Sequence, residues 1–283
     1  MRRMRRGLRL LSRRGAAVLG AAILLLVAVI ALAAPAINRT DPLTMSPAHA
    51  LAPPSAAHPF GTDQYGRDVL SRVIAGARLS LATGLGAVLI ALAGGLGVGL
   101  ASGAAGGWVD LLLMRVVDVM MAFPSVLLAL VVVAILGQGS ANVMVAVGVS
   151  LIPTFVRLIR GNVLVVREHA YVEAARALGG PPSRVTLRHI LPNIVAPVVV
   201  LGTIAVAWAI IIGASLSFLG LGPRPPLPEW GVDLSNGRNY LLRGWWISGG
   251  PGLAILTTVV AVNLVGDSLR DVLDPRLRSL TNF

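Results

Sequence analysis

The residues of this chain best suited to chemistry lie in one polar stretch between two long apolar segments. From Glu173 to Pro192 the stretch reads EAARALGGPPSRVTLRHILP. Glu173 with His169 or His189 suggests general acid–base chemistry, but no nucleophile accompanies them and neither histidine has a partner at metal-ligand spacing. The carboxylate of Glu173 is better suited to a charge-assisted hydrogen bond with another protein. The pattern therefore favours a docking loop over a catalytic centre.

The same stretch predicts two short helices separated by a stiff corner. The first helix, around Tyr171 to Leu178, is rich in alanine, which favours helix and leaves room for close docking. Gly179 and Gly180 permit the positive φ that ends a helix. Two prolines then stiffen the corner, a serine is expected to cap the second helix, and a third proline opens the next apolar segment: Pro181, Pro182, Ser183 and Pro192.

The composition of the whole chain indicates a membrane protein. Hydrophobic residues make up 55% of the 283 residues and charged residues 13%, with a mean hydropathy of +0.81, whereas soluble domains carry about a quarter charged residues. All 24 basic residues are arginine. The net charge of +12 does not indicate nucleic-acid binding, because the arginines cluster beside apolar segments. The lack of cysteine excludes disulfides, cysteine-ligated metals and thiol catalysis.

The apolar segments predict an all-α integral membrane protein with six transmembrane helices. Crossing about 30 Å of hydrocarbon takes about 20 residues of helix. The uncharged stretch Val119–Val156 is too long for one span, and its polar turn at 137–142 divides it into the third and fourth spans. The other spans are Gly15–Ala34, Leu81–Ala105, Ile194–Ala214 and Gly250–Gly266. A cleaved signal peptide is the alternative for the first span, but its apolar run is longer than such peptides use.

Arginine bias predicts the orientation and the segment boundaries. With a cytoplasmic N-terminus, the inner segments hold 17 arginines and the outer segments seven, as the positive-inside rule requires. Both termini and the Glu173 loop are then cytoplasmic. The predicted segments are a basic tail 1–14, a first span 15–34, an outer segment 35–80, a five-helix core 81–266 with an inner loop 157–192 and an outer loop 215–249, and a tail 267–283.

Polar residues inside the spans are few: Asn263, Gln138, Ser150 and Thr203. We expect Asn263 to form a hydrogen bond between helices. No acid–base relay or metal constellation lies at mid-membrane, so a stand-alone secondary transporter and a membrane-embedded enzyme are both disfavoured. An external energy source is favoured instead.

Two backbone features bear on how the spans pack. Gly95, Gly99 and Gly103 recur every four residues, which places them on one helical face where another helix can approach closely. Packing within the chain is favoured, and contact with a partner protein is the alternative. Pro124 and Pro153 are each expected to kink their spans, because proline removes a backbone donor and clashes with the preceding turn.

Several motifs resemble those of a known transporter family. The loop pattern of Glu173, Ala174, Ala175, Gly179, Ile190, Leu191 and Pro192, with Arg176 inside it, resembles the cytoplasmic coupling loop of permease subunits in ATP-binding-cassette importers. The segments 58–68, 118–124, 215–222, 228–231 and 267–276 look like the C-type subunit of the dipeptide/oligopeptide permease family. The resemblance extends from about Arg13 to Arg278, and importers of nickel chelates, glutathione or opines share it.

The resemblance implies a non-catalytic pore subunit of a bacterial inner membrane. Its expected partners are a homologous B-type permease, two ATP-binding subunits, an extracytoplasmic solute-binding protein and membrane lipid. ATP and Mg²⁺ would be bound by those partners and no cofactor by this chain, which has no lysine for a phosphate-binding loop. Asp63, Arg67 and Asp68 would either pair among themselves, which we favour, or meet the docking receptor. Trp245 and Trp246 are expected at the outer membrane boundary.

Overall fold

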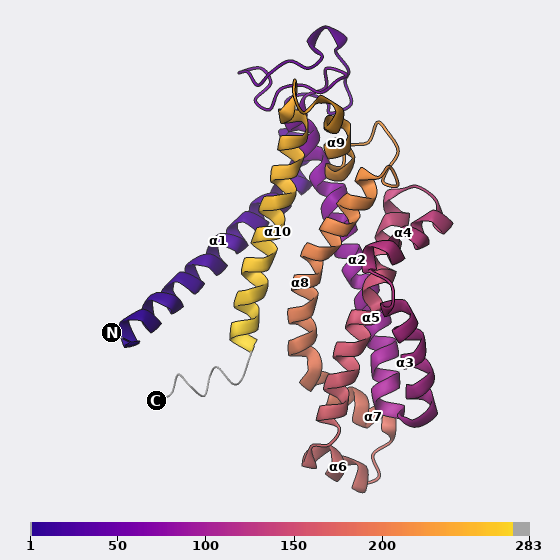
Figure 1. The fold of residues 1–283 in the computed structure, drawn as a ribbon. Helices are drawn as coiled ribbons and strands as arrows, with labels where there is room; N and C mark the ends of the chain where they lie inside the picture. The colour runs from indigo at the N-terminus through magenta and orange to yellow at the C-terminus, as the bar shows by residue number, and fades with distance from the viewer. Residues whose placement is uncertain (1, 274–283) are drawn as a thin grey trace.

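The computed structural model describes residues 2–273, and their side chains from Gly15 onward. The described chain is all-helical, as predicted, and forms an elongated bundle (Figure 1). Its α-helices are α1 (Arg2–Ile37), α2 (Val69–Ala105), α3 (Gly107–Met121), α4 (Ser125–Leu136), α5 (Ser140–Val166), α6 (Ala170–Ala177), α7 (Pro182–Val185), α8 (Leu191–Phe218), α9 (Trp230–Gly237) and α10 (Trp245–Leu273).

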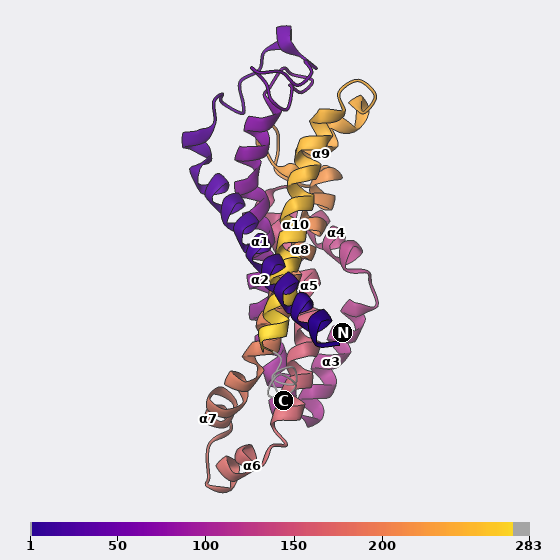
Figure 2. The same ribbon diagram turned by 90° about the vertical axis from the view of Figure 1, so that its left-hand side faces the viewer.

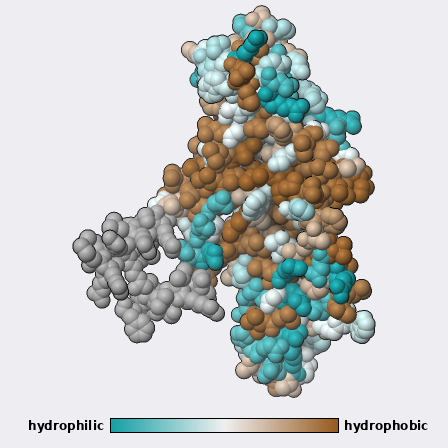
Figure 3. Space-filling model, in the orientation of Figure 1, coloured by the Kyte–Doolittle hydropathy of each residue, from teal (hydrophilic) through white to brown (hydrophobic). Residues whose placement is uncertain are grey.

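The bundle has a different structure at each end. Residues 38–68 and α9 form one end, which we call the head, and α6 and α7 form the other (Figures 1 and 2). Figure 3 shows an apolar belt between polar surfaces at the two ends. Five helices have the length and composition to cross a membrane, and the bent pair α3–α4 brings the number to six when counted as one span. The prediction of six apolar spans is therefore confirmed when α3 and α4 are counted together as one span.

The third span is a broken helix, and the kink predicted at Pro124 is confirmed as this break. Helices α3 and α4 meet at an angle of 94° across Ala122–Pro124. The expected start at Val119 was wrong, because α3 already begins at Gly107 and carries Asp110 and Asp118 through its length. Pro124 lies at the break, where it precedes the first residue of α4. Pro153 lies inside α5, whose helix continues from Ser140 to Val166, and the kink expected there stays a prediction.

Several helices continue beyond the predicted spans into segments expected to be loops. Helix α2 begins at Val69 rather than near Leu81, and its 37 residues extend about 55 Å, well beyond about 30 Å of hydrocarbon. Helix α5 continues to Val166, and α10 to Leu273. Hydropathy identifies only the apolar part of each helix, so it misses the polar turns at their ends. Of the predicted tail 267–283, residues 274–283 lie outside the described range.

The predicted glycine face forms the seam between α2 and α5. A Cβ atom on Gly99 would lie 2.9 Å from Cβ of Ile159, and one on Gly103 would lie 2.7 Å from Cγ1 of Val163. Gly95 faces Phe155 even more closely. The partner side chains are fully buried in the main core cluster. Close packing of this kind is what holds helices together where lipid removes the hydrophobic driving force.

Helix α1 lies at the edge of the bundle and leans away from it toward its N-terminus (Figure 1). Gly20 packs on α10, since a Cβ there would lie 2.9 Å from Cβ of Leu264. At its other end, Asn38 Nδ2 donates to the Ser71 carbonyl at 3.4 Å. Only 11% of the apolar window within Gly15–Ile37 is buried in the isolated chain. That this span is retained stays a prediction.

Asn263 does not have the predicted role. Its side chain is exposed on α10, and it makes no hydrogen bond to any other helix within residues 2–273. The exposed face of α10 also carries Leu256 and Val260, while the neighbouring faces pack on α1 and α8. The position of Asn263 on the helix, rather than its polarity, decides its environment.

Candidate functional site

The loop between α5 and α8 is anchored to the core by three apolar side chains. Val172 of α6, Val185 of α7 and Ile190 are each at most 2% exposed and belong to the main core cluster. They pack with residues of α5 and α8. The two short helices therefore form a protrusion that is fixed to the bundle (Figure 2). A protrusion of this kind can transmit a displacement, because packed side chains resist compression.

The corner between α6 and α7 is built partly as the sequence predicts. Gly179 has a φ of +80°, which ends α6 as expected. Gly180 does not have a positive φ; its amide donates to the Ala175 carbonyl at 3.1 Å, and a Cβ there would lie 2.7 Å from that oxygen. Glycine is thus needed for close approach. Ser183 does not cap α7, because the helix starts at Pro182 and Ser183 already lies inside its first turn.

The loop is continuous with the helix that follows it. A π-helical turn (Thr186–Ile190) joins α7 to α8, so that a helical segment runs from Pro182 to Phe218. Pro192 is the second residue of α8 and follows the π-helical turn directly. A displacement of α7 is therefore passed directly to a membrane-spanning helix.

The motif residues divide into an exposed and a buried set. Glu173, Ala174, Arg176, Gly179 and Pro192 are exposed, whereas Ile190 is buried and Ala175 and Leu191 are half-buried. Glu173 makes no side-chain hydrogen bond or ion pair within the described part of the chain. The exposed set can contact a partner, and the buried set fixes the helices that present it.

Sequence reasoning missed three apolar side chains on the same surface. Leu178 is 88% exposed, Leu187 60% and Tyr171 43%. They lie on α6, at its C-terminal end and in the π-helical turn, close in sequence to the exposed basic residues Arg176, Arg184 and Arg188. Large exposed apolar side chains rimmed by charge are typical of protein–protein contacts. One indication of them was present in the sequence: they do not lie on the same helical face as the buried apolar residues.

Ion pairs join α3 to α5 on the α6–α7 side of the bundle. Arg160 forms a bidentate ion pair with Asp110, in which Nε lies 2.5 Å from Oδ1 and Nη2 lies 2.6 Å from Oδ2. Ser102 of α2 also donates to Asp110. Nearer the break, Arg157 Nη2 donates to Asp118 at 2.8 Å. These pairs explain how α3 carries two carboxylates.

In the head, Asp63, Arg67 and Asp68 are all buried. Arg67 Nε donates to Asp63 Oδ2 at 2.6 Å. Asp68 caps α2 by accepting from the Ser71 amide at 2.7 Å, and its other oxygen lies 2.8 Å from His58 Nδ1. The structure thus gives these residues internal partners.

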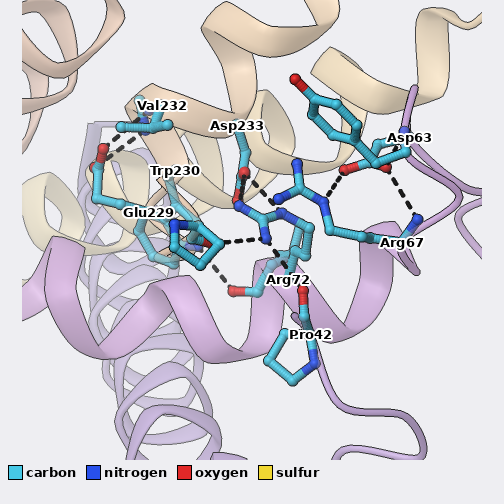
Figure 4. Close-up of polar contacts among 12 residues, drawn as sticks. Pro42, Asp63, Arg67, Arg72, Glu229, Trp230, Val232 and Asp233 are labelled. Atoms are coloured by element: carbon cyan, nitrogen blue, oxygen red, sulfur yellow. Dashed lines mark hydrogen bonds and ion pairs between the residues drawn. The ribbon is translucent and has the colours of Figure 1, made fainter. Parts of the chain in front are cut away.

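A second buried network ties the head to α2 (Figure 4). Arg72 donates to Asp233 Oδ1 from Nε at 2.9 Å and from Nη2 at 2.5 Å. Its Nη1 donates to the carbonyls of Pro42 and Pro226 at 3.1 and 3.2 Å. One guanidinium group therefore holds three segments and its own helix together.

Neighbouring polar groups complete this network. Glu229 accepts from Ser80 Oγ at 3.0 Å and caps α9 by accepting from the amide of Val232 at 2.9 Å. Burial raises the pKa of Asp233 to about 6, although Arg72 opposes the shift. Asp233 Oδ2 is buried and has no hydrogen-bond partner in the described part of the chain.

The two tryptophans at the start of α10 differ in their environments. Trp246 Nε1 donates to the Thr62 carbonyl at 3.0 Å, and its ring covers Gly61. Trp246 therefore packs within the head, and its place at the membrane boundary stays a prediction. Trp245 remains 64% exposed. Among the described residues, no group of three or more His, Asp or Glu side chains could hold a metal ion.

Comparisons with known proteins agree with this architecture. Residues 95–279 match the family described as the binding-protein-dependent transport system inner membrane component, and residues 3–54 match the N-terminal transmembrane domain of oligopeptide transport permease C. The chain is 48% identical to the glutathione transport system permease protein GsiD of Pectobacterium atrosepticum over 80% of this chain and 75% of that protein. It is 42% identical to the dipeptide transport system permease protein DppC of Alkalihalophilus pseudofirmus over 93% and 86%.

Proposed function

The chain belongs to the family of binding-protein-dependent transport system inner membrane components, and on that premise we propose that it is a permease subunit of an ATP-driven importer of dipeptides and oligopeptides. It forms half of the translocation path and pairs with a homologous B-type permease. The similarity to a dipeptide permease over 93% of the chain supports peptide as the cargo.

The observation that carries this proposal is the exposed α6–α7 surface on a fixed protrusion. Glu173 and Arg176 provide charge, Leu178 provides an apolar anchor, and α7 continues into α8. A cytoplasmic ATPase that binds this surface can move α8 as it opens and closes. The chain itself is not an enzyme in this scheme; ATP and Mg²⁺ are bound by two partner subunits.

The orientation follows from this role. The α6–α7 end and both termini face the cytoplasm, and the head faces outward, where a solute-binding protein delivers the peptide. The 17 arginines of the predicted inner segments support this arrangement. Internal partners for Asp63, Arg67 and Asp68 favour a structural role for them over receptor docking.

The test is transport by the complete complex reconstituted in lipid vesicles. Labelled dipeptide should accumulate only when this subunit, its B-type partner, both ATPases, the receptor and ATP are all present. Accumulation without the ATPases would contradict the proposal.

Glutathione is a second candidate cargo, because a relative named as a glutathione permease is 48% identical over 80% of this chain. The same vesicles, offered labelled glutathione and labelled dipeptide with each candidate receptor, distinguish the two. Uptake of glutathione alone would assign the chain to that cargo and leave the coupling mechanism unchanged.

A further inference from the structure

A groove of about 550 Å³ lies between α5, α8 and α10 on the α6–α7 side of the bundle. Its wall is largely apolar and includes Leu158, Pro197 and Leu201. Three polar residues, one from each helix, interrupt this wall: Asn162, Asn193 and Arg270. Grooves of about 300–1,000 Å³ with a few convergent polar groups are typical of sites for small molecules.

The polar groups of the groove have unused hydrogen-bonding capacity. Asn162 Nδ2 donates to the Leu158 carbonyl at 2.8 Å, and Asn193 Nδ2 donates to the His189 carbonyl at 2.7 Å. Each bond uses one of the two N–H groups of its amide and leaves the Oδ1 atom as an acceptor. Arg270 makes no ion pair with the described side chains of residues 15–273, although Asp267 lies one turn before it on α10. The groove therefore offers one cation and two acceptors.

A guanidinium with no ion pair among the described side chains, at the edge of an apolar wall, favours an anion there. A carboxylate matches the planar fork of arginine in two parallel hydrogen bonds. Free Oδ1 atoms match N–H donors such as the amino and amide groups of a peptide. A small peptide carries both the carboxylate and the N–H donors that match these groups of the groove.

We propose that this groove is a low-affinity station for a small peptide with a free carboxylate. The carboxylate binds Arg270, and peptide N–H groups donate to Asn162 and Asn193. The inference rests on the proposed function and specifies which chemical group of the cargo this subunit contacts. Exposure of Arg270 and Asn193 to solvent keeps the binding weak, which allows the peptide to leave.

The test uses the reconstituted transporter and two cargoes, a dipeptide and the same dipeptide amidated at its C-terminus. Arg270→Gln should reduce the rate of uptake of the free acid about tenfold, which is the loss of about 1.4 kcal/mol of interaction, and should leave uptake of the amide nearly unchanged. Arg270→Lys should retain most of the uptake of the free acid. Arg115→Gln, which removes an exposed arginine of α3 outside the groove, is the matched control and should change neither rate.

The outcomes separate this inference from the proposed function. An equal loss for both cargoes, or no loss for either, would overturn the carboxylate station. Failure of the wild-type complex to import any peptide would instead contradict the proposed function. A second readout uses the cysteine-free background: a fluorophore on Ala196→Cys, a residue of the groove wall, should respond to millimolar free dipeptide and not to the amide in the assembled complex. Cross-linking of this cysteine to the partner permease at full yield would show that protein fills the groove and would also overturn it.

Discussion

Arg72 and Asp233 lie 161 residues apart in the sequence and form a buried ion pair in which Nη2 lies 2.5 Å from Oδ1. The pair joins α2 to α9, and both side chains are nearly inaccessible to solvent. Because Arg72 also donates to the carbonyl of Pro42 in the head and to that of Pro226 before α9, this contact joins the head to the bundle.

Removing the carboxylate should destabilise the protein strongly. Asp233→Ala leaves the buried charge of Arg72 without its partner, which costs about 3–5 kcal/mol in comparable sites. Asp233→Asn should cost much less, because Oδ1 can still accept from Arg72 and the amide nitrogen takes the position of the unpartnered Oδ2. Thermal unfolding of the purified subunit in detergent measures both. Equal melting temperatures for the two variants would contradict the assigned geometry.

The stability of the head should depend on pH through Asp233. The folded-state pKa of about 6 lies above the ordinary value of 3.8, so the folded state binds more protons between these values. The contribution of this group to stability therefore rises as the pH falls from 7 through 6 toward 4. Arg72, Arg67 and Glu229 are the charged groups that act on it.

The difference in melting temperature between wild type and Asp233→Asn isolates this effect, since other titrating groups cancel. We expect the melting temperature of the wild type to rise relative to that of the variant when the pH is lowered from 7.5 to 5. A difference that does not change with pH would show that Asp233 stays ionised throughout.

The glycine seam should not tolerate a methyl group. Gly95→Ala would place its Cβ against Phe155 of α5, and overpacking of this kind costs about 1–3 kcal/mol. Gly97→Ala is the matched control on the same helix, because a Cβ there meets nothing within 4 Å. Melting temperatures should fall for the first variant and stay level for the second. A loss of similar size at both positions would point to a general effect on α2 instead.

The predicted topology can be mapped with single cysteines, since the native chain has none. Ser183→Cys on α7 should react with an impermeant thiol reagent only after cells are opened. Ala56→Cys in the exposed part of the head should react with the same reagent in intact cells. Labelling of Ser183→Cys in intact cells would reverse the orientation proposed here.

The sequence predicted what depends on local pattern. Apolar length predicted the spans, four-residue spacing predicted the face of Gly95, Gly99 and Gly103, and a glycine predicted the end of α6. It failed where a distant partner decides the outcome. Asp110 is compatible with a helix in the bundle because Arg160, 50 residues later, binds it, and no local window contains both. The Arg72–Asp233 pair was missed for the same reason.

The measurement that tests coupling most directly is the ratio of peptide imported to ATP hydrolysed by the reconstituted complex. Glu173→Arg reverses the exposed charge of α6. Loss of one charge-assisted hydrogen bond costs about 1.5–3 kcal/mol, so peptide uptake should fall at least about tenfold while the receptor still binds peptide normally. Glu168→Arg, an equal charge change five residues earlier and outside the motif, should preserve the ratio. A normal ratio and normal uptake in Glu173→Arg, at normal expression, would contradict the assignment of the α6–α7 surface as the site of ATPase coupling.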